Sequence, residues 1–269
     1  MMAPNTRLMA VYQSNYIIYY RCCRFGGGYV QKIVLFLSLL MTPLITNANF
    51  MVYPISKDIE EGGSELIRIY SKSKDVQYIK VYTKKVLNPG TKEEYEVDAP
   101  NWEGGVVTTP SKVILPGGSS RSVRITQLKI TSTEEVYRVY FESIKPEKQE
   151  NLSKNNSLKT DLSVNIIYAA LIRVLPKNGK SDVSVSLSPK DSLLIKNTGN
   201  VRFGMKEAFF CKTPIINDDD CMKKKYNKNI YPGSSFDTGV KQNGFTHIFI
   251  DSADESVDEQ RKRILVSIP

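Results

Sequence analysis

The sequence contains few of the residues that catalysis most often uses. Its only histidine is His247, and its only tryptophan is Trp102. A serine or cysteine hydrolase with a histidine base would depend on that one imidazole, and neither a G-x-S-x-G elbow nor a phosphate-binding G-x-x-x-x-G-K motif occurs. Acidic groups such as Glu134–Glu135 and Asp218–Asp220 fall in expected turns, where solvated surface is the simpler interpretation. We therefore expect no enzymatic activity and no cofactor.

The chain also lacks an apolar run long enough for an ordinary membrane span. The run at 33–45 follows Lys32 and is followed by Thr46-Asn47-Ala48, whereas a transmembrane helix needs about 20 apolar residues. This pattern is typical of a secretory signal peptide cleaved after Ala48. A membrane anchor is the alternative, but nothing else in the chain supports it. The segment before Lys32 is too long for an ordinary leader, so we expect translation to begin at Val30.

The charge of the exported chain is only mildly basic. The leader, residues 1–48, contains four basic residues and no acidic one, so its removal lowers the net charge from +9 to +5. Nucleic-acid-binding proteins carry denser cation clusters on one face, and we expect no nucleic acid partner. The basic runs at 222–226 and 260–265 are interpreted as solvated surface. The remaining length suits two domains of about 100 residues each.

Cysteine is scarce once the leader is removed. Cys22 and Cys23 lie within the leader, which leaves Cys211 and Cys221. In an exported protein, an isolated and closely spaced pair is typical of a disulfide. A metal site that combines this pair with His247 and the acidic run 218–220 is the alternative, but the spacing matches no known ligand pattern.

Short strand patterns account for the rest of the chain. They are rich in β-branched and aromatic residues, and Gly and Pro turns separate them, as in β-sandwiches; the segments are 65–73, 76–86, 121–130, 134–145, 182–189, 192–200, 202–210, 246–251 and 262–268. A break at Pro176 and a turn at 177–179 predict two domains, 49–175 and 178–269. The two cysteines are too close in sequence for the inter-sheet disulfide of true immunoglobulin domains.

One strand, DLSVNIIYAALIRVLP at 161–176, raises a specific question. Leu162, Val164, Ile166 and Tyr168 alternate with mostly polar residues, and a long polar segment precedes them. Edge strands normally avoid partners by means of charges, proline or bulges, and this one does not. Pattern alone favours ordinary core packing, and the alternative is a strand that binds a partner through its main chain and apolar side chains.

Several short motifs resemble the periplasmic chaperones of the chaperone–usher pathway for pilus assembly. In YPISKDIEEGGS, Lys57 lies five positions before Gly62, and YRVYFESIKP at 137–146 resembles the penultimate strand of the family's first domain. A variable loop and the alternating strand follow, and KNTGNVRF and YPGSSFDTG resemble turns of the second domain. The similarity covers essentially all of 49–269 and is closest to the alternate clade that serves colonisation-factor (alpha) fimbriae.

This resemblance implies an all-β fold of two immunoglobulin-like β-sandwich domains in a boomerang arrangement. It also implies a protein of the Gram-negative periplasm that binds major and minor fimbrial subunits and delivers them to an outer-membrane usher. The mechanism would be donor-strand complementation, in which a strand of the chaperone fills the groove of an incomplete subunit. By position, Leu162, Val164, Ile166 and Tyr168 would fill that groove. Self-association of the subunit-free chaperone is a further expectation.

The resemblance also implies two basic residues that bind the subunit's terminal carboxylate and thereby fix the strand register. By alignment these are Lys57 and Arg173. Arg173 lies three positions before Pro176, whereas the better-known branch has its cation five positions before the proline; an ungapped match would place Leu171 there. We prefer a two-residue shortening, which keeps a cation at the anchor. The arginine that forms the family's interdomain salt bridge is missing, so that contact is not assigned.

Two other functions remain as rivals. A structural pilus subunit or adhesin would carry an N-terminal donor extension, but here the segment 49–58 runs directly into a predicted strand. A carbohydrate- or receptor-binding sandwich would have aromatic residues clustered on its loops, but Trp102 is the only tryptophan.

Overall fold

The structure is a computed structural model that describes residues 9–13, 16–20, 49–99, 105–144, 165–253 and 261–268. The chain separates into two compact units, Met1–Asn47 and Ala48–Pro269. In the first unit, β1 (Met9–Gln13) and β2 (Tyr16–Tyr20) form an antiparallel pair. The residues expected to form the signal peptide lie outside the described part of the chain.

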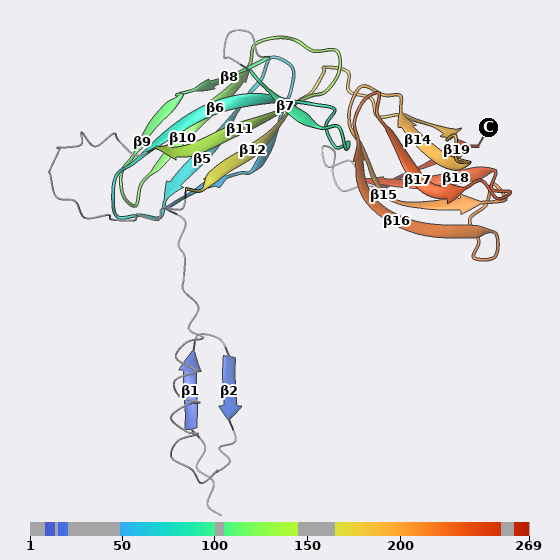
Figure 1. The fold of residues 1–269 in the computed structure, drawn as a ribbon, viewed down its shortest axis with the longest axis horizontal. Helices are drawn as coiled ribbons and strands as arrows, with labels where there is room; N and C mark the ends of the chain where they lie inside the picture. The colour runs from blue at the N-terminus through green and yellow to red at the C-terminus, as the bar shows by residue number, and fades with distance from the viewer. Residues whose placement is uncertain are drawn as a thin grey trace, which may run out of the picture. The chain divides into compact units, whose positions relative to one another are not determined.

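The second unit begins with a sandwich of two sheets, which we call the first sandwich (Figure 1). One sheet has the strand order β3-β5-β10-β8, and the other has the order β4-β12-β11-β6-β7, with β9 also paired to β6. Their bounds are β3 Phe50–Tyr53, β4 Ser56–Ile59, β5 Ser64–Ser71, β6 Gln77–Leu87, β7 Tyr95–Asp98, β8 Val106–Thr109, β9 Lys112–Leu115, β10 Ser120–Gln127, β11 Glu135–Ile144 and β12 Ile167–Val174.

The core of the first sandwich follows from alternation along its strands. Ile67 and Ile69 of β5 and Val123 and Ile125 of β10 are fully buried, as expected where every second side chain of a strand points to the same face. Their counterparts on the opposite sheet are Ile79, Val81, Val139, Phe141, Ala170, Ile172 and Val174. The inward face of β12 is therefore part of this core.

A second sandwich with its own apolar core follows. Its sheets have the orders β13-β14-β17 and β16-β15-β18-β19. The bounds are β13 Val183–Leu187, β14 Ser192–Asn197, β15 Phe203–Cys211, β16 Cys221–Ile230, β17 Ser235–Lys241, β18 His247–Ala253 and β19 Arg261–Ser267.

The all-β prediction is confirmed, and each strand pattern named from the sequence overlaps an observed strand. Five strands of the second unit were not anticipated: β7, β8, β9, β16 and β17. The basic segment 222–226, interpreted as solvated surface, makes up half of β16, and the segment compared with a family turn contains the start of β17. Within the described residues, no helix is long and apolar enough to cross a membrane.

The strand at the start of the first sandwich changes sheets. β3 pairs with β5 in one sheet, and β4 pairs in parallel with β12 in the other. Pro54 lies between β3 and β4, and proline has no backbone N–H to donate to a sheet. β4 pairs with Leu171–Val174 of β12.

Candidate functional site

β12 has one free edge over half of its length. All eight residues pair with β11, from Ile167 opposite Glu142 to Val174 opposite Glu135. On the other side, β4 covers Leu171–Val174, and no strand among the described residues covers 167–170. The first half of the strand therefore offers unpaired main-chain groups to a partner.

The direction of the main-chain N–H groups of β12 follows from its hydrogen bonds to Ile55 and to β4. The N–H of Leu171 donates to the carbonyl of Ile55 at 2.9 Å, and that of Leu175 donates to Ile59 at 2.8 Å. Alternate residues of a strand direct their N–H groups to the same side, so those of Ile167 and Ala169 point toward the free edge. An added strand would find donors and acceptors in regular order there.

Ile166, directly before the free half, and Tyr168 within it are only partly covered, whereas Ala170 is buried. Ile166 is 43% exposed, and Tyr168 is half-buried with its ring edge-on to Phe50 at a centroid distance of 5.1 Å. Ile166 and Tyr168 alternate in sequence with Ala170, so their side chains lie on the same, core-facing side of the strand as Ala170. Of the four residues predicted to fill a partner's groove, Leu162 and Val164 lie outside the described residues.

Arg173 lies in the half of β12 that is paired on both sides, and it is 7% exposed. Its Nε donates to Asp58 at 2.7 Å, and a second guanidinium nitrogen contacts the other oxygen of Asp58, so the pair is bidentate. A third nitrogen lies 3.6 Å from Glu134. Arg173 thus links β4 to β12 and lies beside the buried Glu134.

Glu134 connects this cluster to the second sandwich. Its Oε2 accepts a hydrogen bond from the backbone N–H of Arg202 at 2.5 Å, and its own N–H donates to the carbonyl of Asn200 at 2.8 Å. Burial raises the pKa of Glu134, although the Arg202 N–H and the guanidinium of Arg173 act in the opposite direction. The carboxyl group is therefore easier to protonate than an exposed glutamate.

Lys57 lies on the other face of the same sheet. It pairs in register with the buried Ile172, and its ammonium reaches Glu65 on β5 at 2.9 Å. Asp58 and Arg173 share the outward face instead. The structure therefore does not bring the two predicted anchors together, and each is paired with a different carboxylate. Their role in carboxylate binding stays a prediction.

The ungapped alternative, Leu171, lines a cavity of about 290 Å³ together with residues of β6, β11 and β16. Its cross-strand neighbour there is Arg138, which pairs with Glu94 at 2.6 Å and also with Glu96. Lys228, which also lines the cavity, donates to the carbonyl of Gly90 at 2.6 Å. Leu171 also packs with Val86, Val136 and Tyr231.

The charges at this cavity are already balanced by one another. Hydrogen bonding from the Gly90 N–H lowers the pKa of Glu94, with help from Arg138. Burial opposes ionisation of Glu96, yet hydrogen bonds from Arg138 and Tyr140 leave its pKa lowered. The same carboxylates raise the pKa of Arg138, and the pKa of Tyr140, raised chiefly by burial, reaches about 12. The cluster is a satisfied ion network.

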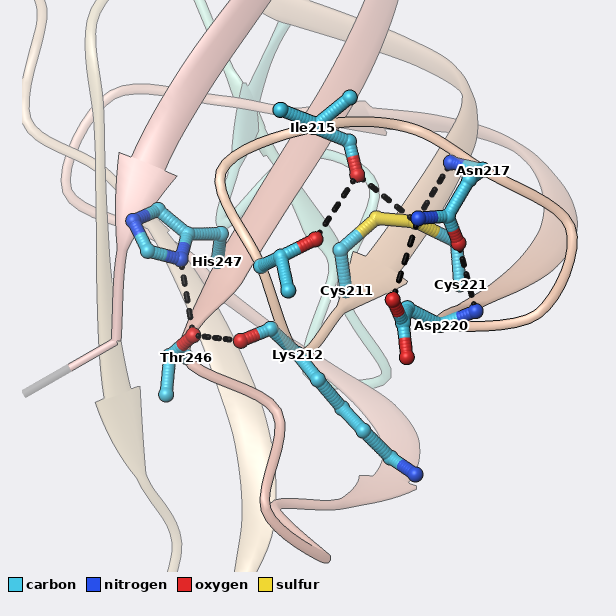
Figure 2. The surroundings of a disulfide bond; sticks show 9 residues. Cys211, Lys212, Ile215, Asn217, Asp220, Cys221, Thr246 and His247 are labelled. Carbon is cyan, nitrogen blue, oxygen red and sulfur yellow. Dashed lines mark hydrogen bonds between the residues drawn. A yellow bond between two sulfur atoms is a disulfide. The ribbon is translucent and has the colours of Figure 1, made fainter.

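The predicted disulfide is present. Cys211 and Cys221 lie directly opposite each other on β15 and β16, and their Cα atoms are 4.1 Å apart (Figure 2). His247 contacts the Thr246 hydroxyl through Nδ1 at 2.8 Å. Among the described residues, no three His, Cys, Asp or Glu side chains are grouped so that they could hold a metal ion.

Comparison with known proteins gives close relatives, although no family model matches the chain. The chain is 80% identical over 234 residues to a CS1 fimbrial subunit of Escherichia coli, covering 87% of this chain and 98% of that protein. It is 56% identical over 240 residues to a CFA/I fimbrial subunit of Escherichia coli, covering 89% and 100%.

Two solved structures are similar at the level of both fold and sequence. One is the class 5 fimbriae chaperone CfaA, with 55% identity and a TM-score of 0.74, covering 82% of this chain and 99% of that one. The other is a chaperone–tip adhesin complex of CFA/I fimbriae biogenesis, with 53% identity, the same TM-score and the same coverage.

Proposed function

Because the chain belongs to the chaperone–usher family of fimbrial chaperones, whose solved members include CfaA, we infer that it captures fimbrial subunits by lending them β12. The two immunoglobulin-like sandwiches of the family are present here. The observation that carries the inference is the free edge at 167–170. A subunit that lacks its last strand would complete its sheet on that edge.

Capture would work by β-augmentation. Main-chain hydrogen bonds to Ile167 and Ala169 would supply order and affinity, and the inward-parity side chains would fill the apolar groove of the subunit. Full burial of a large apolar side chain contributes about 1.5–3 kcal/mol before ordering costs. Leu162, Val164, Ile166 and Tyr168 remain the proposed groove-filling set.

Carboxylate binding at Lys57 and Arg173 is a separate part of the proposal. Lys57 keeps a partly exposed ammonium with one carboxylate partner, Glu65. Arg173 already forms a bidentate pair with Asp58, which a subunit carboxylate would have to share or displace. The two residues are therefore tested one at a time, because Lys57 could bind a subunit carboxylate without breaking a bidentate ion pair and Arg173 could not.

The same inference includes the cellular setting. We propose that an N-terminal signal peptide exports the chain to the periplasm, where it holds subunits until an outer-membrane usher receives them. We assign it no catalytic activity, in keeping with the chaperones to which it is similar. The boundary between the two domains is proposed at 176–177, between β12 and β13.

The test is co-expression of the chain with a fimbrial subunit, followed by affinity capture and quantification of the captured protein in the periplasm. Ile166→Asp should abolish stable capture, because a carboxylate would enter the apolar groove. Leu187→Asp is the matched control, since Leu187 is 42% exposed on the second sandwich. If capture by the Ile166 variant equals capture by the control, β12 is not the donor strand.

A further inference from the structure

Arg173, one of the two cations predicted to bind the subunit carboxylate, is already paired with an internal carboxylate. Its Nε donates to Oδ1 of Asp58 at 2.7 Å, and a terminal nitrogen contacts Oδ2, so the pair is bidentate. The two residues lie directly opposite each other in the parallel register of β4 and β12. A guanidinium fork suits any carboxylate, so Asp58 holds Arg173 in the way that a chain terminus would.

The two carboxylates around Arg173 differ in how well solvent reaches them. The side chain of Asp58 is 29% exposed, whereas those of Arg173 and Glu134 are 9% and 0% exposed. β4, which contains Asp58, has four residues and pairs within the described part of the chain with β12 alone. A group that approaches from solvent therefore meets Asp58 before it meets Glu134, and Asp58 is the accessible carboxylate of the cluster.

Asp58, rather than Glu134, holds the guanidinium group. Oε1 of Glu134 lies 3.6 Å from Nη1 of Arg173, which is longer than a hydrogen bond. Within the described residues, this buried oxygen accepts no hydrogen bond at all. Arg173 would satisfy it by moving toward Glu134 and away from Asp58. The observed position therefore reflects a competition between two carboxylates for one cation, and the competition favours Asp58.

A subunit strand on the free edge would meet this pair end-on. For its terminal carboxylate to lie near Arg173, a segment at 167–170 must run parallel to β12, which is also the direction of β4. β4 begins with Ser56 opposite Leu171, so the segment and β4 would lie end to end along the same edge. At about 3.3 Å per residue, a terminus beside Ser56 lies about 7 Å from Asp58 along the strand. The long side chain of Arg173 could reach it by turning away from Asp58.

We propose that Asp58 is an internal competitor for the subunit's terminal carboxylate and thereby sets how tightly a subunit is held. In the free chain it keeps Arg173 paired and ordered, and in the complex the subunit carboxylate takes its place. Because one bidentate carboxylate replaces another, the exchange adds little net affinity, and Asp58 can pair with Arg173 again when the subunit leaves. The inference rests on the proposed function, since it requires that β12 hold a subunit and that Arg173 bind its carboxylate.

Direct competition between two forms of the chain measures the effect. Wild type and one variant, with different affinity tags and in equal amounts, are co-expressed with a limiting amount of one fimbrial subunit, and the subunit bound to each is quantified. We expect Asp58→Asn to hold about five- to tenfold more subunit than wild type, because Arg173 then gains a charged partner instead of exchanging one. Asp58→Glu keeps a carboxylate and should stay close to wild type, as should Asp75→Asn, an exposed acid-to-amide control.

Other results would overturn the proposal. Equal or smaller amounts of subunit on Asp58→Asn than on wild type, at a similar thermal unfolding midpoint, would show that Asp58 does not compete. A gain for Glu65→Gln with none for Asp58→Asn would assign the subunit carboxylate to Lys57 instead. Failure of wild type to capture any subunit would contradict the proposed function itself.

A second measurement needs no variant and holds even if Asp58→Asn fails to fold. The NMR resonance of the Asp58 carboxyl carbon is followed in the wild-type chain, free and in complex with the subunit. We expect it to shift on binding, because Asp58 loses its partner Arg173. An unchanged resonance in a complex that has formed would show that Asp58 keeps Arg173, and would overturn the proposal while leaving strand donation by β12 intact.

Discussion

The two halves of β12 differ in a way that explains how one strand can serve both the chaperone and a client. Leu171–Val174 is paired on both sides and contains the buried Ile172 and Arg173. Residues 167–170 have β11 on one side and an open edge on the other. The paired half fixes the position and direction of the strand, so the open half can be ordered before the client arrives.

Prior order of this kind lowers the entropic cost of binding. A flexible segment that folded only on contact would lose conformational entropy at that moment, whereas a strand already aligned by β11 has lost most of it in advance. The predictions below perturb the paired half or the open half separately, in order of expected effect.

The largest effect is expected for Arg173→Met in the paired half. It leaves Asp58 and the buried Glu134 without their cation, and breaking a buried pair in this way costs about 3–5 kcal/mol of unfolding free energy. Urea denaturation measures the loss. The double variant Arg173→Met with Asp58→Asn should recover part of it, and a single variant as stable as wild type would contradict the structural role.

Truncation of apolar side chains should affect stability in the paired half of β12 and subunit capture in the open half. Ile172→Ala removes a fully buried side chain and should cost about 2–4 kcal/mol of stability. Ile166→Ala should leave stability nearly unchanged, because Ile166 is exposed, yet weaken subunit capture. Denaturation and capture assays on both variants test this contrast, which fails if Ile166→Ala destabilises the free chain as much as Ile172→Ala does.

A smaller, pH-dependent effect is expected at Glu134. Its pKa is raised in the folded chain, so the unfolded state releases its proton first as the pH increases, and folding becomes less favourable above the unfolded pKa. Glu134→Gln removes this linkage and keeps an acceptor for the Arg202 N–H. The stability of the variant relative to wild type should therefore rise between pH 4 and pH 7, as followed by denaturation at each pH. A difference independent of pH would exclude the linkage.

The smallest effect on stability is expected for Lys57→Met. Its ion pair with Glu65 is partly exposed, and such pairs contribute about 0–1 kcal/mol. If Lys57 binds the subunit carboxylate, capture should fall about tenfold or more while the unfolding free energy hardly changes, since a charge-assisted hydrogen bond contributes about 1.5–3 kcal/mol. Wild-type capture by this variant would remove Lys57 from the site.

Much of the fold could be predicted because alternation and turn residues are local signals. β5, β6, β10, β11 and β12 each show β-branched or aromatic residues between Gly, Pro or polar breaks. β16 lacked such a pattern because it is an edge strand of its sheet, and lysines along an edge prevent pairing with other chains. A run of lysines is therefore compatible with a strand as well as with a solvated loop.

The site could be predicted only in part, because the faces of β4 and β12 depend on their mutual register. Lys57 and Asp58 are neighbours in sequence, and a shift of one residue would exchange which of them faces Arg173. No local pattern determines a parallel pairing between segments so far apart in the sequence. The Asp58 partner of Arg173, and the opposite faces of Lys57 and Arg173, are for that reason visible only in the structure.

Backbone hydrogen exchange of β12, measured by NMR in the free chain and in the subunit complex, tests the central claim most directly. In the free chain the Leu171 amide, bonded to Ile55, should exchange slowly, while those of Ile167 and Ala169 should exchange quickly. Binding of the subunit should slow Ile167 and Ala169 at least a hundredfold and leave Leu171 protected. If both amides still exchange quickly in the subunit complex, the open half of β12 is not the strand that the subunit receives.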